Sequence, residues 1–375
     1  DATLNRFTDK TINVVEKGAA ATTLNASAVL GSTSKLNVDA SEMTGGGFAF
    51  AISNGIDGFK GSSQVDTITV GASAFLTDAD VLNGGAGNNN VFDFDTTGAA
   101  KQIVTASQLT NVSNFNTWNI KDTAVAANAF ELTVTNAVAA QNINSTNNTL
   151  TISAATNAND KVTIDASDVG SAYKLNVATG TAAAAAGAQT VKLGAGDDFI
   201  TLNSAAAGAT VNTVTLGGGK DTVVFATNTA SATGAVATNN TVKDVNLGTA
   251  TGTGANVDKL DFQAFTILDA VAGGTFDTAI RVHNGATATA SNVIVLSNVS
   301  YDTAAAIDTA VATQTNLNGA VLVIWQDSLG RVKIGVDAHG DTATGANDIK
   351  TIAAFEGVTI TGVATALDAG DLILG

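Results

Sequence analysis

Two short blocks of glycine and aspartate within residues 193–225 constrain the fold of this chain more than any other feature. They read L-G-A-G-D-D-F-I-T-L and L-G-G-G-K-D-T-V-V-F. Both match the repeat G-G-x-G-x-D-x-U-x, in which U is a large apolar residue. Asp198 with Ile200, and Asp221 with Val223, hold the corresponding positions. This pattern predicts stacked turns of a β-solenoid, with the U residues pointing into the core.

The chemistry of these residue types explains their spacing. Glycine adopts positive φ without strain, so a tight turn can direct several backbone carbonyls toward one point. The aspartate adds a charged oxygen where the turn ends. Calcium prefers oxygen ligands of this kind and takes about six to eight of them. Because one turn provides too few, we expect an ion between two neighbouring turns. The alternative is a pair of ordinary hairpin or solenoid turns that hold no ion.

Two weaker copies of the blocks lie upstream. Asp66 is followed by an apolar residue at the U position, but the later glycine of the motif is missing. Gly85 and Gly87 precede Asn89, so the second copy keeps the glycines and replaces aspartate with asparagine. The steps from 66 to 89 and from 198 to 221 are both 23 residues. Asparagine offers an uncharged oxygen, so we expect weaker calcium binding at this copy.

The chain also shows signs of an internal duplication. Residues 35–42 (K-L-N-V-D-A-S-E) resemble residues 161–168 (K-V-T-I-D-A-S-D), and the turn blocks repeat at a similar offset of about 125–130 residues. We therefore expect three segments. Residues 1–112 form a β-ladder with degenerate turns, residues 113–241 form a second copy with calcium-binding turns, and residues 242–375 form a capping C-terminal domain.

Composition favours continuous β-ladders. The 375 residues include no proline, which would remove ladder donors, and only 13% are charged. Small and β-branched residues dominate, in short runs of alternating polarity. We expect an all-β fold, a parallel β-roll or β-solenoid with strand-rich ladders and a β-rich C-terminal domain. The net charge of −16 disfavours nucleic acid as a partner and is consistent with bound cations or with solubility alone.

The sequence lacks the motifs of familiar hydrolases. It has two histidines, no cysteine, no H-E-x-x-H and no G-x-S-x-G. Carboxylate pairs such as Asp78/Asp80 and Asp93/Asp95 would suit glycosidase acids, metal binding or solvation. We therefore expect that this chain is not an enzyme.

The C-terminal part completes a resemblance to a known family. The element D-K-L-D-F at 258–262, an apolar hairpin at 321–338 and an aspartate followed by apolar residues at the end occur in this order. Together with the turn blocks, this order resembles the RTX proteins, a secreted calcium-binding family whose repeats form a parallel β-roll. In that family the first element closes the roll, and the C-terminal segment carries the type I secretion signal. The departure is an insert at 266–318, in which we expect residues 302–312 to be helical. The expected calcium-binding residues are Gly194, Gly196, Asp198, Gly217, Gly219, Asp221, Asp66, Gly85, Gly87, Asn89, Asp258 and Asp261.

The whole pattern is similar to the C-terminal region of bacterial surface-layer proteins of the type I-secreted RTX family. This resemblance implies a secreted, extracellular structural protein that binds calcium and self-associates into a two-dimensional lattice on the cell surface. It implies the type I secretion apparatus as a partner, and a cell-surface polysaccharide or the outer membrane, contacted through a part preceding residue 1. Two alternatives remain: an adhesin or repeat spacer that binds a host or glycan ligand, and the non-catalytic secretion half of an enzyme.

Overall fold

The structure is a computed structural model that describes residues 11–26, 33–96, 101–122, 129–155, 161–180, 188–203, 211–226, 240–248, 256–265, 280–283, 292–313, 320–337, 349–368 and 371–373. The chain divides into two compact units, and each is described by itself. The first comprises Asp1–Gly180 with Thr190–Gly196, and the second comprises Thr181–Gln189 with Asp197–Gly375. This division falls between residues 180 and 197, whereas the sequence suggested boundaries after residues 112 and 241.

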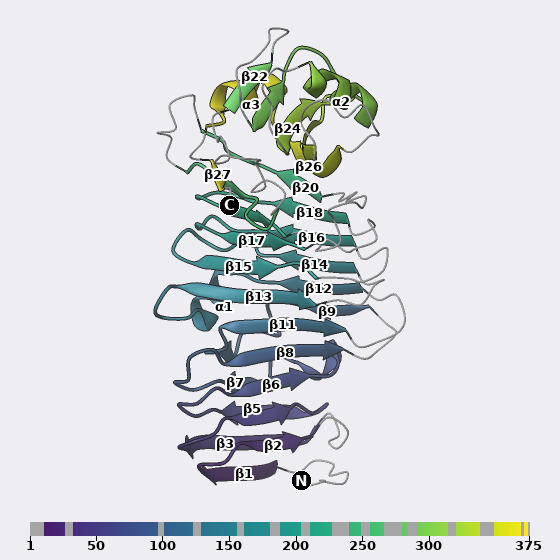
Figure 1. Ribbon diagram of the computed structural model, residues 1–375. Coiled ribbons are helices and arrows are strands. Elements are labelled where there is room, and N and C mark those ends of the chain that lie inside the picture. Colours follow the sequence, from purple (N-terminus) through teal and green to yellow (C-terminus); the bar gives the residue numbers. More distant parts are fainter. Residues whose placement is uncertain are drawn as a thin grey trace. The chain divides into compact units, whose positions relative to one another are not determined.

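The first unit is a β-solenoid, in which the chain passes repeatedly between parallel sheets so that successive strands lie side by side (Figure 1). One sheet has the order β1 (Thr11–Gly18), β3 (Lys35–Met43), β5 (Ile56–Lys60), β7 (Val81–Asn83) and β10 (Val112–Ser113). A second has the order β2 (Thr22–Asn25), β4 (Phe48–Ala51), β6 (Thr67–Val70), β8 (Val91–Thr96), β11 (Thr117–Asp122), β13 (Thr149–Ala155) and β15 (Lys174–Ala178).

A third parallel sheet takes over from the first partway along the unit. It contains β9 (Gln102–Val104), β12 (Ala129–Thr133), β14 (Lys161–Asp165) and then β16 (Ala188–Lys192), whose residues 190–192 belong to this unit. Short helices η1 (Ser73–Phe75) and α1 (Asn136–Asn142) lie in the connections. The strands thus alternate between two sheets in each part of the coil stack, which confirms the predicted all-β solenoid.

The core of each coil is built from alternate strand residues. In β3 the burial alternates along K-L-N-V, so that Leu36 and Val38 are buried while their neighbours face outward. The U residues Ile200 and Val223 are also fully buried, as the motif predicts. One exception concerns β8, where Val91 is half-buried and Phe92 takes the interior position.

The second unit combines a continuation of this coil architecture with a mixed sheet. Its first sheet has the order β17 (Phe199–Leu202), β19 (Thr222–Phe225), β21 (Lys259–Asp261) and β27 (Leu372–Ile373). Its second has the order β18 (Val211–Thr215), β20 (Asn240–Lys243), β26 (Lys350–Glu356), β25 (Val332–Asp337), β24 (Val321–Gln326), β23 (Val293–Leu296) and β22 (Ile280–His283). Only the pairs β24–β25 and β25–β26 are antiparallel among these described strands.

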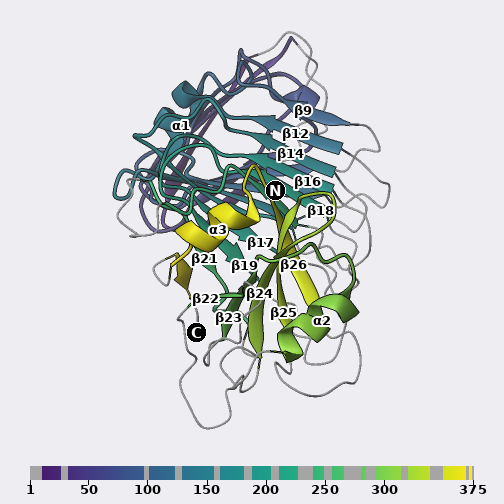
Figure 2. The same cartoon turned by 90° about the horizontal axis from the view of Figure 1, so that it is seen from above.

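The expected apolar hairpin and the expected helix both occur in the second unit. β24 and β25 form the hairpin, and Gly330 ends its turn with a φ of +80° and an N–H bond of 2.9 Å to the carbonyl of Asp327. Helix α2 (Ala304–Ala312) falls within the predicted segment and lies beside β24 and β25 in Figure 2. Its Ile307 and Val311 pack into a buried cluster with Trp325.

Candidate calcium-binding turns

The turn blocks hold equivalent places in the coils. Each block begins directly after one strand and forms a turn. The last residue of the turn immediately precedes the next strand, which is β6, β8, β17 or β19. Asp66 precedes β6, Asp198 precedes β17, Asp221 precedes β19 and Asp258 precedes β21. All four aspartates are buried, with at most 2% of the residue exposed. Their carboxyl groups are therefore part of the coil interior at the corner.

In the second unit the aspartates form a hydrogen-bonded column. Oδ1 of Asp221 accepts the backbone N–H of Asp198 at 2.9 Å, and Oδ1 of Asp258 accepts the N–H of Asp221 at 2.9 Å. Strand pairing places Asp198, Asp221 and Asp258 in register across β17, β19 and β21. The carboxylates of Asp221 and Asp258 thus each satisfy a backbone donor of the coil before them, which stabilises the corner without any ion.

Two of the predicted calcium ligands have both carboxylate oxygens occupied by backbone donors. Asp66 accepts the N–H of Phe48 on Oδ1 and the N–H of Ser62 on Oδ2, both at 2.6 Å. Asp258 accepts the N–H of Asp221 on Oδ1 and the N–H of Asn246 on Oδ2, the latter at 2.7 Å. Each of these aspartates accepts N–H groups from two different places in the chain. Hydrogen bonds within the protein therefore account for both carboxylate oxygens, and no ion is needed to explain them.

A second pair of buried aspartates, Asp57 and Asp80, shows the same arrangement. The sequence marked Asp80 only as half of the Asp78/Asp80 carboxylate pair and did not mark Asp57. Asp80 Oδ1 accepts the N–H of Asp57 at 2.7 Å, and Asp80 Oδ2 accepts the N–H of Thr77 at 2.6 Å. Asp57 accepts both the N–H and the hydroxyl of Ser53. The sequence signal was the spacing of 23 residues between the two aspartates and a hydroxyl residue three or four positions before each.

Asp221 differs from these aspartates. Its Oδ1 bond to Asp198 is the one hydrogen bond of its carboxyl group within the described part of the chain, so Oδ2 has no donor, although the residue is 1% exposed. Burial raises the pKa of Asp221 to about 8, opposed by the Asp198 bond and reinforced by the charges of Asp258, Asp198 and Asp197. A buried carboxylate oxygen among like charges is unfavourable unless a cation or a proton neutralises it.

The turn before Asp221 explains the missing donor. Gly217 and Gly219 have φ of +86° and +119°, values that residues with a side chain rarely adopt. In the turn before Asp66, which has the same length, the N–H of Ser62 donates to the carboxylate, whereas no N–H of the described turn before Asp221 bonds to the Asp221 carboxylate. The glycine pair therefore gives a turn whose N–H groups leave one carboxylate oxygen of Asp221 open.

In the first strong block, close packing requires glycine at position 194. Gly194 and Gly196 belong to the first unit, because the division of the chain falls within this block. A Cβ on Gly194 would lie 2.4 Å from the carbonyl oxygen of Val169, and Gly196 is buried. Neither has a positive φ. The close approach of the neighbouring turn at Val169 explains the glycine at 194.

The weaker upstream block is shifted by one residue from the sequence alignment. Asn89 lies in the turn with φ of +66° and is exposed, whereas Asn90 is fully buried and pairs in register with Asp66. Asn90 Oδ1 accepts the N–H of Asp66 at 2.9 Å, over a step of 24 residues rather than 23. The alignment that gave Asn89 the aspartate position is therefore corrected, because this turn contains one more residue than the turn before Asp66.

The turn around Gly85 and Gly87 stacks directly on the turn of the preceding coil. Gly85 has φ of +78°, and its Cβ would lie 2.2 Å from the carbonyl oxygen of Ser62. A Cβ on Gly87 would lie 1.9 Å from the carbonyl oxygen of Gln64. Both distances are far shorter than real contacts, so only glycine fits. The contact brings several carbonyl oxygens of this corner near Asn90.

The amide nitrogen of Asn90 lies at the point where these carbonyls converge. Nδ2 donates to the oxygens of Gly84, Gly87 and Asn114 at 2.7, 3.0 and 2.9 Å. Asn142 has a similar place at the end of α1, where its Nδ2 donates to the carbonyls of Val112 and Val138. Both amides are fully buried. At these corners a neutral N–H group neutralises the carbonyl dipoles.

The remaining predicted ligand, Asp261, lies on β21 and is 9% exposed. Its Oδ1 accepts the N–H of Gln263 at 2.9 Å, which shapes the chain after the strand. Asp371 was not among the predicted ligands but lies at the same corner, since its carbonyl accepts the N–H of Leu260 as β27 pairs with β21. Burial raises the pKa of Asp371. Burial also raises the pKa of Asp258 to about 6, opposed by the N–H bonds from Asn246 and Asp221 and reinforced by the charge of Asp371.

The side chains and carbonyls at these corners offer oxygen atoms as donors. Within the described residues, no group of three or more histidine, cysteine, aspartate or glutamate side chains is arranged to hold a metal. Sites for zinc or iron need such groups, whereas calcium accepts backbone carbonyls and water beside one or two carboxylates. Asp221, with one open oxygen after a glycine turn, fits the calcium type.

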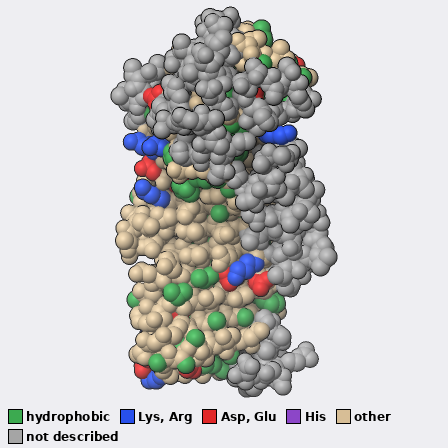
Figure 3. Space-filling model, viewed as in Figure 1, with side chains coloured by type: hydrophobic (Ala, Val, Ile, Leu, Met, Phe, Trp, Pro, Cys, Tyr) green, Lys and Arg blue, Asp and Glu red, His purple; other side chains and the backbone are tan. Residues whose placement is uncertain are grey.

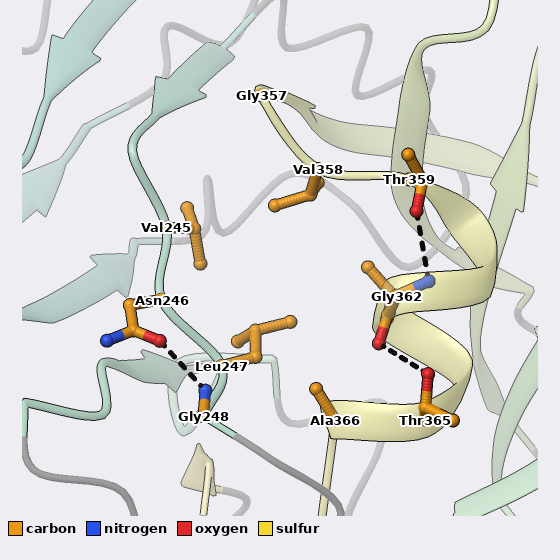
Figure 4. A pocket seen from close by; sticks show the side chains of 11 residues that line it. Val245, Asn246, Leu247, Gly248, Gly357, Val358, Thr359, Gly362, Thr365 and Ala366 are labelled. Atoms are coloured by element: carbon orange, nitrogen blue, oxygen red, sulfur yellow. Dashed lines mark hydrogen bonds between the residues drawn. The ribbon is translucent and has the colours of Figure 1, made fainter.

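A cavity of about 510 Å³ in the second unit has a different character (Figure 4). Its lining is mostly apolar, and Val245, Leu247 and Val358 point into it from the loop after β20 and from the segment before α3 (Ile360–Ala366). The polar group of Asn246 accepts the N–H of Gly248, so it is used within its own loop. The lining contains no titratable side chain. The cavity therefore lacks the acid and base that most hydrolytic reactions need.

Comparison with known proteins returned no match. No family model matches the chain, and neither do curated proteins or solved structures. The fold and the turns define the class on their own: a parallel β-solenoid with buried aspartate and asparagine columns at its corners. Among the described helices, none has both the length and the apolar character needed to cross a bilayer.

Proposed function

We propose that this chain is a structural protein of the extracellular surface whose β-solenoid is stabilised by calcium. The observation that carries the proposal is the open Oδ2 of Asp221, an oxygen that has no donor among the described residues although it belongs to a buried residue. Asp66 and Asp258, by contrast, accept a backbone N–H group on each of their two carboxylate oxygens. A cation bound at this oxygen would favour the ionised form of the Asp221 carboxyl group.

The residues would act as follows. Asp221 would supply the charged ligand, and carbonyl oxygens of the turn at 217–220 with water would complete the coordination. Calcium would supply positive charge that offsets the repulsion among Asp197, Asp198 and Asp258. The turn would then be locked onto β19, and the column of bonds from Asp198 to Asp258 would be held in register.

Calcium binding would make folding depend on whether the chain is inside or outside the cell. Inside a cell calcium is scarce, so like charges at the corner disfavour the coil. Outside, calcium exceeds the dissociation constant of about 10⁻⁴–10⁻³ M that is typical of extracellular modules. At about 100 times this constant, one site adds about 2.7 kcal/mol to stability. A chain that is unfolded before export suits type I secretion, and we propose this route together with assembly into a surface lattice.

Calcium titration of the purified chain tests the binding step. Isothermal titration calorimetry after chelator treatment is expected to show at least one site, with a gain of β-structure by far-ultraviolet circular dichroism. No heat and no spectral change up to about 10 mM calcium would refute calcium-coupled folding, since this exceeds the expected constant. Electron microscopy with and without calcium then tests assembly, because ordered sheets support the lattice and dispersed particles contradict it.

An adhesin is the second candidate, and one surface feature favours it. A groove of about 500 Å³ on the outer face of the sheet of β1, β3, β5 and β7 is floored by Gly58 and flanked by Val15, Val81 and the Asp39–Lys60 ion pair. Most of the described surface on the face shown in Figure 3 is uncharged. A groove with a neutral overall charge suits a hydroxyl-rich ligand such as a glycan. Glycan binding without sheet formation would favour this candidate.

A further inference from the structure

The Asn90 corner carries an inference about which coils need calcium. Three backbone carbonyls, those of Gly84, Gly87 and Asn114, lie within 3.0 Å of the Asn90 amide nitrogen. They come from the turn of Asn90 itself and from the next coil, and Oδ1 of the same side chain accepts the N–H of Asp66 in the coil before. One side chain thus joins three consecutive coils.

Converging carbonyl oxygens are the arrangement that attracts a cation, because their dipoles point to one place. Here the place is filled by a nitrogen that carries two hydrogens and no charge. The nitrogen is covalently attached, so the corner is satisfied at any calcium concentration. A carboxylate in this position would instead set an anionic oxygen against three carbonyl oxygens.

We propose that Asn90 takes the place of a calcium ion, so that the corner of the first unit is independent of calcium and the requirement is confined to the Asp221 corner of the second unit. Asn142, whose amide donates to the carbonyls of Val112 and Val138 and whose oxygen accepts the N–H of Phe115, extends the same device to a second corner. The confinement rests on the proposed calcium function of Asp221, whereas the role of Asn90 is tested separately.

Whether the corner residue is asparagine or aspartate therefore determines whether the corner needs a cation. Asn90→Asp creates a carboxylate beside three carbonyls, which together form a hard oxygen set that water can complete. The variant is expected to lose order at this corner in a chelator and to regain it with calcium. Asn176→Asp is the matched control, because Asn176 lies on β15 at a partly buried position between the buried Leu175 and Val177, and its side chain bonds to no carbonyl among the described residues.

Hydrogen exchange with mass spectrometry on the full chain tests both parts. In the wild type, peptides over β8 are expected to exchange equally in calcium and in chelator, while peptides over β19 exchange faster in chelator. In Asn90→Asp, peptides over β8 are expected to exchange about tenfold faster or more in chelator, with wild-type rates restored by calcium but not by magnesium. Asn176→Asp is expected to show neither effect.

The outcomes separate the two proposals. If peptides over β19 exchange at the same rate in calcium and in chelator in the wild type, the proposed function fails. A calcium-dependent exchange rate over β8 in Asn90→Asp would still support the role of Asn90. If peptides over β8 in the wild type respond to calcium as strongly as those over β19, the inference is overturned, even where the variant does not fold. It is also overturned if Asn90→Asp keeps wild-type exchange in chelator.

Discussion

Asp221→Asn distinguishes a calcium-binding carboxylate from a purely structural one. The variant keeps an oxygen that can accept the N–H of Asp198, the 2.9 Å bond of the wild type. It replaces the open oxygen with a neutral amide and removes one negative charge from a corner that also holds Asp197, Asp198 and Asp258. In chelator the variant is therefore expected to be more stable than the wild type, because no buried charge has to be neutralised.

In calcium the order is expected to reverse. With about 10 mM calcium and a dissociation constant of about 10⁻⁴ M, one site stabilises the wild type by about 2.7 kcal/mol. For a unit of this size, each kcal/mol shifts the midpoint of thermal unfolding by about 2–4 °C, so the expected gain is about 5–10 °C. The variant lacks the charged ligand, so we expect it to gain less than about 2 °C, on the same scale.

Thermal unfolding by circular dichroism in chelator and in calcium measures these four midpoints, and hydrogen exchange over β19 assigns the transition to the second unit. The two curves should cross, with the variant ahead in chelator and the wild type ahead in calcium. If the variant keeps the full calcium shift, Oδ2 of Asp221 is not a ligand. If neither protein shifts, the argument from the open oxygen is wrong altogether.

Three further predictions follow from the other corners. Asp66→Asn places an amide where two N–H donors meet, so one donor loses its acceptor. The free energy of unfolding, measured with urea, should fall by about 1–3 kcal/mol, equally with and without calcium. A loss of stability seen only in calcium would instead make Asp66 a calcium ligand. Burial, opposed by bonds from Ser53 and reinforced by Asp80, raises the pKa of Asp57 to about 7, so its folded form holds a proton more tightly than the unfolded chain. The resulting stability is present below pH 3.8 and is lost as the pH rises through about 7, so Asp57→Asn should flatten this dependence, while an unchanged pH profile contradicts the assignment. Gly85→Ala should lower the free energy of unfolding by more than about 1 kcal/mol, because Gly85 has a φ of +78° and an added Cβ would lie 2.2 Å from a carbonyl oxygen. Gly71→Ala is the control and should have little effect, because a Cβ there would meet no atom closer than 4.0 Å. Equal losses of stability in the two variants would refute the steric argument.

Several features of the fold could be predicted from local patterns in the sequence. Alternating polarity placed Ile200 and Val223 in the core, and the turn chemistry at Asp327 placed the hairpin correctly. Helix α2 also fell inside the segment that the sequence marked as helical. Each of these features depends on neighbours within a few residues, where periodicity and turn preference are decisive.

Register and long-range pairing were beyond the sequence. The run of three asparagines at 88–90 gives no local reason to prefer one, and only pairing with β6 and β11 selects Asn90. The bond from Asn240 to the carbonyl of Ile352 crosses 112 residues, and β27 returns to pair with β21. Such contacts depend on how whole coils stack, which a motif of nine residues does not specify.

The choice between aspartate and asparagine at each corner follows the polarity of the backbone groups around it. Asp66 and Asp258 lie where N–H groups converge, and a carboxylate, which only accepts, suits that place. Asn90 lies where carbonyls converge, and only an amide can donate to them. Asp221 and Asp371 are buried carboxyl groups of the described residues that accept a donor on one oxygen only. The number of ions is therefore expected to be smaller than the number of glycine–aspartate motifs, because a motif binds an ion only where its turn leaves the carboxylate without backbone donors.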